Sequence, residues 1–189
     1  MITLTCKARE SQKKGDVKRL RRESFIPFVV YSKGKNAEMG MTPKEEIDAA
    51  MRSIRPGFLP TTVFSLKMET GKVLSVIARE VQYKPTSYEI LHIDFMELDE
   101  KIPVEVKVPI ELTNTVDCIG VKLGGFLQYV MRHVRVRCLP KNIPSHFQVD
   151  VKDLNIAQTR RVSDLVFPAG ATCLDSMDKV VVTLAKFNA

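Results

Sequence analysis

Apolar and polar side chains alternate along many segments of this chain, and that pattern limits what the chain can fold into. The clearest run is 104–112, where valine recurs at every second position from Val104 to Val108. Glu105 and Lys107 lie between these valines. Successive side chains of a strand point to opposite faces, so a period of two indicates strands with one buried face. We therefore predict a mainly β protein.

The other strands follow from the same alternation and from the turn residues that interrupt it. They are expected at 2–9, 26–31, 61–68, 72–82, 88–95, 126–138, 147–151, 162–167 and 179–187. Pro27 limits its segment to the start of a strand or the edge of a sheet, because proline has no N–H to donate to a neighbouring strand.

Two short helices are expected near the N-terminus. The segment 16–24 has Asp16 as its candidate N-cap, after a polar turn at Ser11–Gly15. The sequence Thr42-Pro43-Lys44-Glu45 has the capping-box pattern, with proline at the first helical position. A helix over 43–54 is therefore predicted, and the Pro-Gly pair that follows should end it.

Length and charge distribution bear on domain organisation. At 189 residues the chain is long enough for one large domain or two small ones. Residues 96–102 are acidic and polar, and a new set of alternating strands begins after them. Residues 1–95 carry a formal net charge of +6, whereas residues 96–189 carry +1. We predict an N-terminal domain over 1–96 and a C-terminal all-β domain over 97–189.

Composition narrows the class of protein. Hydrophobic residues make up 44% of the chain and charged residues 27%, which is typical of folded soluble proteins. No stretch approaches the roughly 20 apolar residues that span a bilayer, and no N-terminal apolar run resembles a secretory signal. We expect a cytoplasmic protein without a membrane partner. The four cysteines are too scattered for a metal or redox site, so they should be small buried side chains: Cys6, Cys118, Cys138 and Cys173.

The excess of positive charge is concentrated at the start of the chain. The first 35 residues hold ten Lys or Arg and three acids, and their net charge of +7 equals that of the whole chain. The predicted first helix carries Lys18, Arg19, Arg21 and Arg22. Such a cluster is either a solvated helix face or a site for a polyanion. Arg9, expected to point outward from its strand, adds to the cluster, and nucleic acid is the first candidate partner.

The segment 88–95 contains a second candidate site. Its alternation directs three apolar side chains toward a core: Leu91, Ile93 and Phe95. The opposite face holds Tyr88, Ile90, His92 and Asp94. A His–carboxylate pair can act as a general base, but the sequence has no accompanying nucleophile or metal-ligand motif. The same two side chains could instead bind base edges or ribose hydroxyls of RNA, or simply be solvated.

Three further features are open to simpler interpretations. Tyr31 could either pack against its neighbours or stack on a ligand. Arg135 and Arg137 share a strand face with His133, and we interpret that face as solvated. Gly124-Gly125 lacks the sequence context of a phosphate loop and is interpreted as a turn.

Several of these residues together resemble a known family. The pattern consists of Arg9, Lys14-Gly15, Lys18-Arg19-Leu20-Arg21, Pro27, Tyr31, Gln82 and His92-Ile93-Asp94-Phe95. It is similar to the pattern of the bacterial large-subunit ribosomal protein numbered twenty-five. The segment 116–125 resembles a glycine-ended loop of the long two-domain form of that family, the general-stress type called CTC.

The resemblance implies a six-stranded N-terminal β-barrel with short helices, which binds 5S ribosomal RNA at an internal loop of non-Watson–Crick pairs. It implies RNA contacts for Arg9, Lys14, Lys18, Arg19, Arg21, Tyr31, Gln82, His92 and Asp94. The protein would then be a structural constituent of the large ribosomal subunit, with no catalytic residue, metal, cofactor or small-molecule substrate. The partner of its C-terminal domain stays open between other ribosomal proteins, ribosomal RNA and a translation factor.

The chain departs from the family pattern at Lys13, Lys18, Phe28 and Ser32. Lys18 keeps the charge of the arginine common at its position but loses the bidentate geometry. Three other classes stay open: a non-ribosomal RNA-binding stress protein, an enzyme that uses His92 and Asp94, and a basic module for DNA or membrane surfaces.

Overall fold

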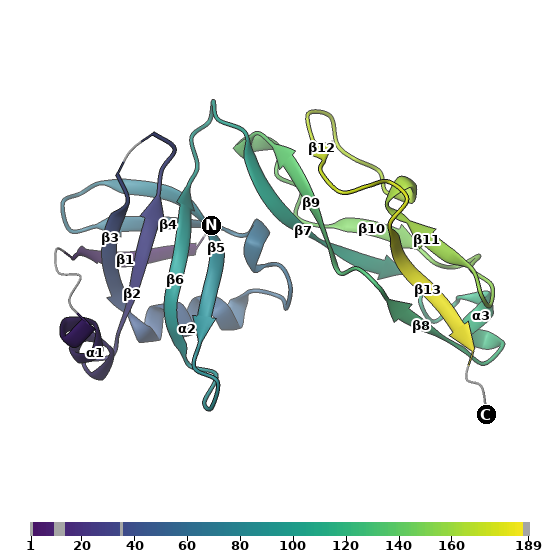
Figure 1. The fold of residues 1–189 in the computed structure, drawn as a ribbon, viewed down its shortest axis with the longest axis horizontal. Helices are drawn as coiled ribbons and strands as arrows, with labels where there is room; N and C mark the ends of the chain where they lie inside the picture. The colour runs from purple at the N-terminus through teal and green to yellow at the C-terminus, as the bar shows by residue number, and fades with distance from the viewer. Residues whose placement is uncertain (1, 10–13, 35, 187–189) are drawn as a thin grey trace. The chain divides into compact units, whose positions relative to one another are not determined.

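The computed structural model describes residues 2–9, 14–34 and 36–186. The chain divides into two compact units, Met1–Asp99 and Glu100–Ala189. Strands dominate both units (Figure 1), which confirms the mainly β prediction.

The N-terminal unit is a closed six-stranded barrel with strand order β1-β3-β2-β6-β5-β4. The strands are β1 (Ile2–Ala8), β2 (Phe25–Tyr31), β3 (Glu38–Pro43), β4 (Val63–Met68), β5 (Val73–Tyr83) and β6 (Ile90–Glu97). The helical segments are α1 (Lys14–Arg22), α2 (Lys44–Ser53) and the 3-10 turn η1 (Leu59–Thr61). Parallel pairing of β1 with β4 closes the barrel, so the six-stranded barrel implied by the resemblance is confirmed.

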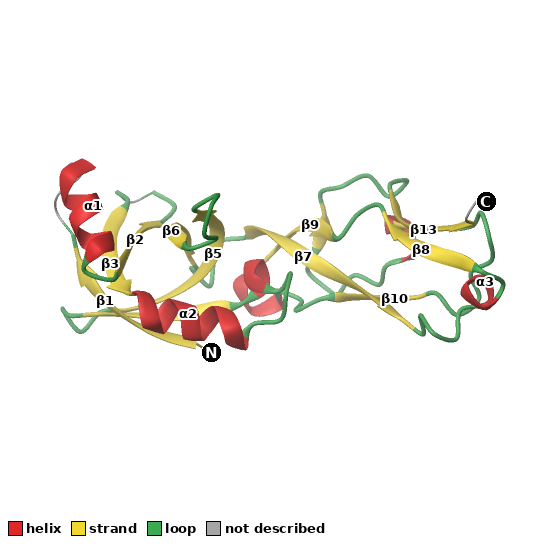
Figure 2. Ribbon diagram, turned by 90° about the horizontal axis from the view of Figure 1, so that it is seen from below, coloured by secondary structure: helices red, strands yellow, loops and turns green. Residues whose placement is uncertain are grey.

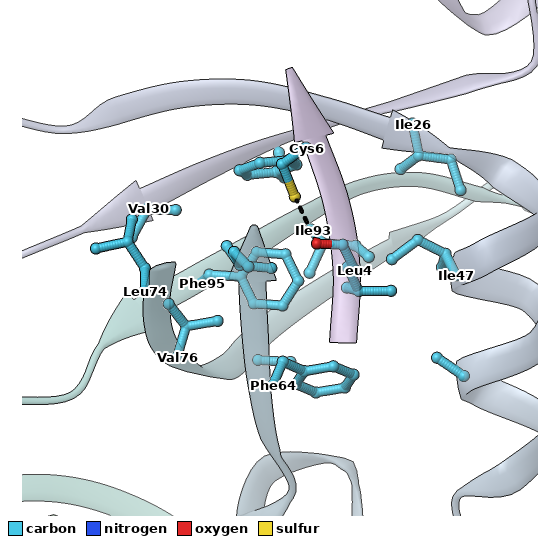
Figure 3. Close-up of a cluster of buried hydrophobic side chains, with 14 of the residues drawn as sticks. Leu4, Cys6, Ile26, Val30, Ile47, Phe64, Leu74, Val76, Ile93 and Phe95 are labelled. Carbon is cyan, nitrogen blue, oxygen red and sulfur yellow. Dashed lines mark hydrogen bonds between the residues drawn. The ribbon is translucent and has the colours of Figure 1, made fainter. Parts of the chain in front are cut away.

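Three phenylalanines fill the barrel interior. The Phe95 ring lies edge-on to Phe28, with 5.6 Å between the ring centroids, and also to Phe64, with 5.7 Å between centroids. Inward-facing aliphatic side chains surround these rings (Figure 3). Gly40 is needed here, because a Cβ at that position would lie 2.4 Å from Cζ of Phe28. Burial, assisted by the charge of Glu46, raises the pKa of the Cys6 thiol to about 12.

Pro27 lies at the start of β2 and not at a sheet edge, since β2 pairs with β3 on one side and β6 on the other. Pro27 is opposite Met41 of β3, and pairing with β6 begins only at Phe28. The missing N–H of the proline therefore falls where the second ladder has not yet begun.

The expected capping box at the start of α2 is wrong. Pro43 occupies the N-cap position, and none of the described side chains caps the helix there. Thr42 instead continues the β3 ladder opposite Ile26 and is fully buried. The first helical N–H, that of Lys44, donates to the carbonyl of Ser24 at 2.9 Å. The helix ends at Ser53, shortly before the Pro-Gly pair, as predicted.

Helix α1 begins two residues earlier than expected, so Asp16 lies in its first turn and is not the N-cap. Most of the polar turn expected at Ser11–Gly15, including the family departure at Lys13, lies outside the described residues. At the other end of the helix, the Glu23 N–H donates to the Arg19 carbonyl at 3.0 Å. Ser24 follows with φ +61°, the left-handed conformation that commonly ends a helix.

Replacing Ser24 with glycine should stabilise the protein by roughly 0.5–1 kcal/mol, because a non-glycine residue is strained at this backbone conformation. Urea unfolding of the Ser24→Gly variant would measure the gain. The control is Ser24→Ala, which loses the same hydroxyl but keeps the strain. An equal gain in the alanine variant would show that the hydroxyl, and not the backbone, is responsible.

The C-terminal unit contains two sheets, with strand orders β10-β7-β9-β12 and β11-β13-β8. Figure 2 labels β7, β9 and β10 of the first sheet and β8 and β13 of the second. Its strands are β7 (Val104–Thr113), β8 (Gly125–Tyr129), β9 (His133–Cys138), β10 (Phe147–Asp150), β11 (Thr159–Arg161), β12 (Thr172–Cys173) and β13 (Val180–Lys186). The helical turns are α3 (Ile119–Lys122), η2 (Pro140–Asn142) and η3 (Val162–Asp164). The alternation that predicted β7 is confirmed from Val104 to Val108, after which Pro109 and Ile110 are both buried.

Two strand predictions in this unit need correction. The single strand expected at 126–138 is two strands, β8 and β9, which belong to different sheets. The strand expected at 162–167 is replaced by the 3-10 turn η3, and β11 precedes it. The Asp164 carboxylate accepts the Arg161 N–H at 2.9 Å, which favours the turn over continued extension.

The glycine turn and three of the four cysteines agree with the expectation, whereas Cys173 does not. Gly124 has φ +86° in the turn after α3, and Gly125 is the first residue of β8, so the turn expected here is made by Gly124. Cys6, Cys118 and Cys138 are buried, whereas Cys173 is only partly buried.

Candidate nucleic-acid interface

Side chains distant in sequence meet on the outside of three adjacent strands. Figure 1 shows β2, β6 and β5 side by side. Gln82 of β5 lies opposite His92 of β6, and Glu80 lies opposite Asp94. We call this outer surface the polar face, and its members are Tyr31, Glu80, Gln82, His92 and Asp94. Four of them were predicted site residues, whereas Glu80 was not.

Tyr31 reaches the polar face through the parallel pairing of β2 with β6. Val29 lies opposite Asp94, and Tyr31, two residues further along β2, lies opposite Met96. Side chains two residues apart share a face of a strand, so Tyr31 is on the same side as Asp94. Tyr31 as a whole residue is 44% exposed at the end of β2. The tyrosine is therefore available to a ligand and is not a packing residue of the barrel core.

His92 and Asp94 form a close pair, as their spacing predicted. The His92 Nδ1 atom is 2.7 Å from the Asp94 Oδ1 atom, and the side chains are 18% and 22% exposed. The direction of approach is not that of a hydrogen bond, and Nδ1 is buried without a hydrogen-bond partner among the described residues. The contact is an ion pair only when the imidazole carries a proton.

The predicted alternation of this strand fails at its first residues. The register passes from Gln82 opposite His92 to Tyr83 opposite Ile90, so Leu91 is an extra residue in β6. Such a β-bulge shifts the alternation by one position. Ile90 is therefore buried, although it was expected on the outer face. Leu91, expected to face the core, is only partly buried. From His92 onward the predicted faces are confirmed.

Helix α1 packs beside β2 and is held to β6 by Arg21. Nε and Nη2 of Arg21 both donate to the Leu91 carbonyl, at 3.1 and 2.9 Å. Lys18 and Arg19 are exposed on the same helix, and Nε of Arg19 is 3.7 Å from the carboxylate of Glu23, a weak surface contact. The helix therefore presents exposed cations next to the His92 end of the polar face.

Two other predicted residues, Lys14 and Arg9, need separate description. Lys14 begins α1, but its side chain lies outside the described part of the structure. Arg9 follows β1, which β3 separates from β2. The Arg9 backbone N–H donates to the Met39 carbonyl at 3.0 Å. Its side chain is half-buried, with Nε enclosed and unpartnered among the described residues, so it does not simply point outward as expected.

Sequence reasoning missed Glu80 and the docking role of Arg21. A register irregularity between Ala78 and Glu80 hides the alternation that would have placed Glu80 opposite Asp94. Arg21 and Leu91 are 70 residues apart, and no local pattern connects them.

The arginines of β9 are paired within the C-terminal unit. Arg135 Nη2 is 3.0 Å from the carboxylate of Asp175, and Arg137 contacts Glu105 across the β7–β9 ladder. The side chain of Asp175 is only 5% exposed. Hydrogen bonds from Arg135 and Lys179 hold the pKa of that carboxyl far below its usual range. These pairs neutralise much of the charge and favour the interpretation that this face is not a nucleic-acid site.

The parts of the chain that the structure describes contain no group of three or more His, Cys, Asp or Glu arranged to hold a metal ion. Within those same residues, no helix is long and apolar enough to cross a membrane.

Comparison with known proteins covers both units. Residues 4–95 match the Ribosomal L25p family, and residues 103–187 match the family described as Ribosomal protein TL5, C-terminal domain. Over 185 residues, the chain is 39% identical to the large ribosomal subunit protein bL25 of Chlamydia pneumoniae and of Chlamydia abortus, and 38% identical to that of Chlamydia caviae. Each alignment covers 98% of this chain and 100% of the relative.

The N-terminal unit is a closed barrel with a polar outer face, and a second β unit follows it. Each unit matches a family of ribosomal proteins, so the chain is a two-unit ribosomal protein. The chain belongs to the L25p family, in the long two-domain form of bL25. This family is structural and not enzymatic, so the alternative of an enzyme using His92 and Asp94 is set aside.

Proposed function

We propose that this protein is a structural constituent of the large subunit of the cytoplasmic ribosome and that its barrel binds 5S ribosomal RNA at an irregular internal loop. The ribosomal role rests on the family, since the chlamydial relatives are named large ribosomal subunit proteins. The observation that supports RNA binding is the convergence of Tyr31, Gln82, His92 and Asp94 on one face beside the basic helix α1.

The two parts of this surface suit different parts of an RNA. The exposed cations of α1, Lys18 and Arg19, suit phosphates, which supply affinity but little sequence information. The polar face suits base edges and ribose hydroxyls. A regular A-form helix hides its base edges in a deep, narrow groove, so such a face needs an irregular, widened region to read them. This requirement favours an internal loop over a regular duplex.

Asp94 supports specificity more than affinity. A carboxylate repels the phosphate backbone, so its presence on an RNA-binding face is favourable only where it accepts hydrogen bonds from base N–H groups. His92, 2.7 Å away, offsets part of the carboxylate charge when its ring is protonated. Tyr31 can add stacking or a hydrogen bond from its exposed end.

We assign contacts with neighbouring ribosomal proteins to the C-terminal unit. Its near-neutral charge offers little attraction for RNA. Several large apolar side chains are exposed there, which suits protein contacts: Val116, Leu123, Val130 and Val166.

A competition assay tests the proposal directly. Labelled 5S rRNA bound to the full-length protein should be displaced by unlabelled 5S rRNA at much lower concentrations than by tRNA or duplex DNA. Equal displacement by all three would indicate a general basic module. Preference for 5S rRNA without co-sedimentation with large subunits would instead favour a non-ribosomal RNA-binding protein.

The two contact classes should respond differently to substitution. His92→Ala and Asp94→Ala should each weaken binding to 5S rRNA by roughly 1–3 kcal/mol, with little loss on tRNA, because they remove base or ribose contacts. Lys18→Ala is the comparison, since removing an exposed cation should weaken binding to all RNAs alike. Wild-type affinity of the Asp94 variant for 5S rRNA would show that the polar face does not read this RNA.

A further inference from the structure

We propose that Arg21 is a positioning residue, which sets the distance between the phosphate-binding helix α1 and the polar face and thereby determines specificity. This inference rests on the proposed RNA-binding function. It also reassigns Arg21, for which the family resemblance implies a direct contact with RNA. The structural basis is the pair of hydrogen bonds from the guanidinium to the carbonyl of Leu91.

The Leu91 carbonyl is in a position where a side-chain donor is useful. On one side of β6, the register with β5 skips Leu91 as the bulge residue. On the other side, pairing with β2 begins only at Ile93, which lies opposite Phe28. Pro27, the residue before Phe28, has no N–H to extend that ladder. Leu91 is therefore paired neither with β5 nor with β2 in the described registers, and Arg21 donates to its carbonyl.

The guanidinium geometry limits what else Arg21 can bind. Nε and Nη2 form one edge of the planar fork, and both donate to the same oxygen at 3.1 and 2.9 Å. That edge is therefore not available for a bidentate contact with phosphate. The charge of Arg21 still contributes to the local potential, but its main hydrogen bonds are made within the protein.

The contact between Arg21 and Leu91 lies beside the polar face, so it bears on RNA recognition. Leu91 is adjacent to His92, so Arg21 ties α1 to the strand that carries the polar face. The chain itself holds the end of α1, since Glu23 and Ser24 lead directly into β2. Arg21 adds a second attachment one position before the end of the helix. Two attachments restrict rotation of the helix, so exposed cations such as Lys18 keep a constant offset from His92.

The Arg21→Lys variant separates the positioning role of Arg21 from the effect of its charge. Arg21→Lys keeps the positive charge but replaces the planar fork by a single ammonium group, which cannot form the same two-donor contact. Arg22→Lys is the matched control, because Arg22 is exposed in the same helical turn. Binding of full-length variants to 5S rRNA and to tRNA should be measured over a range of salt concentrations.

We expect Arg21→Lys to weaken binding to 5S rRNA about tenfold, with binding to tRNA and the slope of affinity against salt unchanged. Arg22→Lys should remain within about twofold of wild type on both RNAs. In a double-mutant cycle, His92→Ala should cost less in the Arg21→Lys background than in wild type, because the offset that aligns His92 is already lost. Near-wild-type binding by Arg21→Lys, or additive effects in the cycle, would overturn the proposal.

Measurements on the free protein test the attachment without RNA. The Arg21→Lys variant should show faster amide exchange in α1 and a changed carbonyl carbon shift at Leu91, while exchange in the barrel strands stays unchanged. Unchanged exchange in α1 would contradict the positioning role. If wild-type protein showed no preference for 5S rRNA, the proposed function would fail, whereas the free-protein data would still report whether Arg21 holds the helix.

Discussion

Binding of this protein to 5S rRNA should weaken about a hundredfold between roughly 50 and 200 mM monovalent salt. The first 35 residues carry the whole formal excess of positive charge, and the exposed Lys18 and Arg19 belong to that segment. If about four to six phosphates are neutralised, each contributes roughly −0.7 to −0.9 to the slope of log affinity against log salt. The slope measured by filter binding or fluorescence anisotropy gives the number of contacts.

Removing one lysine charge at a time shows which residues contribute to the salt dependence. Lys18→Ala should reduce the magnitude of the slope by about 0.7–0.9, the contribution of one phosphate. Lys107→Ala is the control, because Lys107 is exposed on β7 in the near-neutral C-terminal unit. A flat profile for the wild type would contradict an electrostatic interface. An equal loss of slope in both variants would move part of the interface to the C-terminal unit.

Replacing Phe95 with alanine should lower the free energy of unfolding of the barrel by about 3–5 kcal/mol. The ring is almost fully buried and makes edge contacts with Phe28 and Phe64 from opposite parts of the barrel. Removing it leaves a cavity and breaks both aromatic contacts. Because folded domains are stable by only about 5–15 kcal/mol, much of the stability of the barrel should be lost. Amide hydrogen exchange resolved along the chain would measure the change.

The same experiment tests the proposed division into two domains. If the two units fold independently, Phe95→Ala should speed exchange in Met1–Asp99 and leave Glu100–Ala189 unchanged. Phe147→Ala is the reciprocal variant, since Phe147 is buried in the C-terminal unit against Phe167, with ring centroids 5.0 Å apart. Faster exchange in both units for either variant would show that they share one cooperative core.

The predicted boundary at residue 96 falls inside a strand. β6 runs to Glu97, which pairs with Val76, and the Leu98 N–H donates to the Ser75 carbonyl at 2.8 Å. Fragments that separate the units should therefore be divided after Asp99. The change in composition near 96–102 marks this region, but hydrogen bonds with β5 place the last barrel residues slightly later in the chain.

Features that depend on neighbouring residues were determined by the sequence alone. The alternation of β7 predicted its buried and exposed faces, and the spacing of His92 and Asp94 predicted that they share a side of one strand. The Pro-Gly pair after α2 predicted the end of that helix. Steric and solvation preferences act over a few residues, so local patterns record them directly. The concentration of charge near the N-terminus is likewise a property of the linear chain.

Features that join distant segments were decided only by the tertiary structure. The pairing of Gln82 with His92, the parallel closure of β1 with β4 and the attachment of Arg21 to Leu91 each depend on contacts between separate parts of the chain. The bulge at Leu91 reverses the expected face of Ile90, because one extra residue shifts a period of two, and nothing in the local alternation marks that residue. Short strands such as β12 are too brief to show an alternation and exist only through pairing with a neighbour. The polar face is assembled by strand register, and register is set by the cooperative packing of the whole barrel.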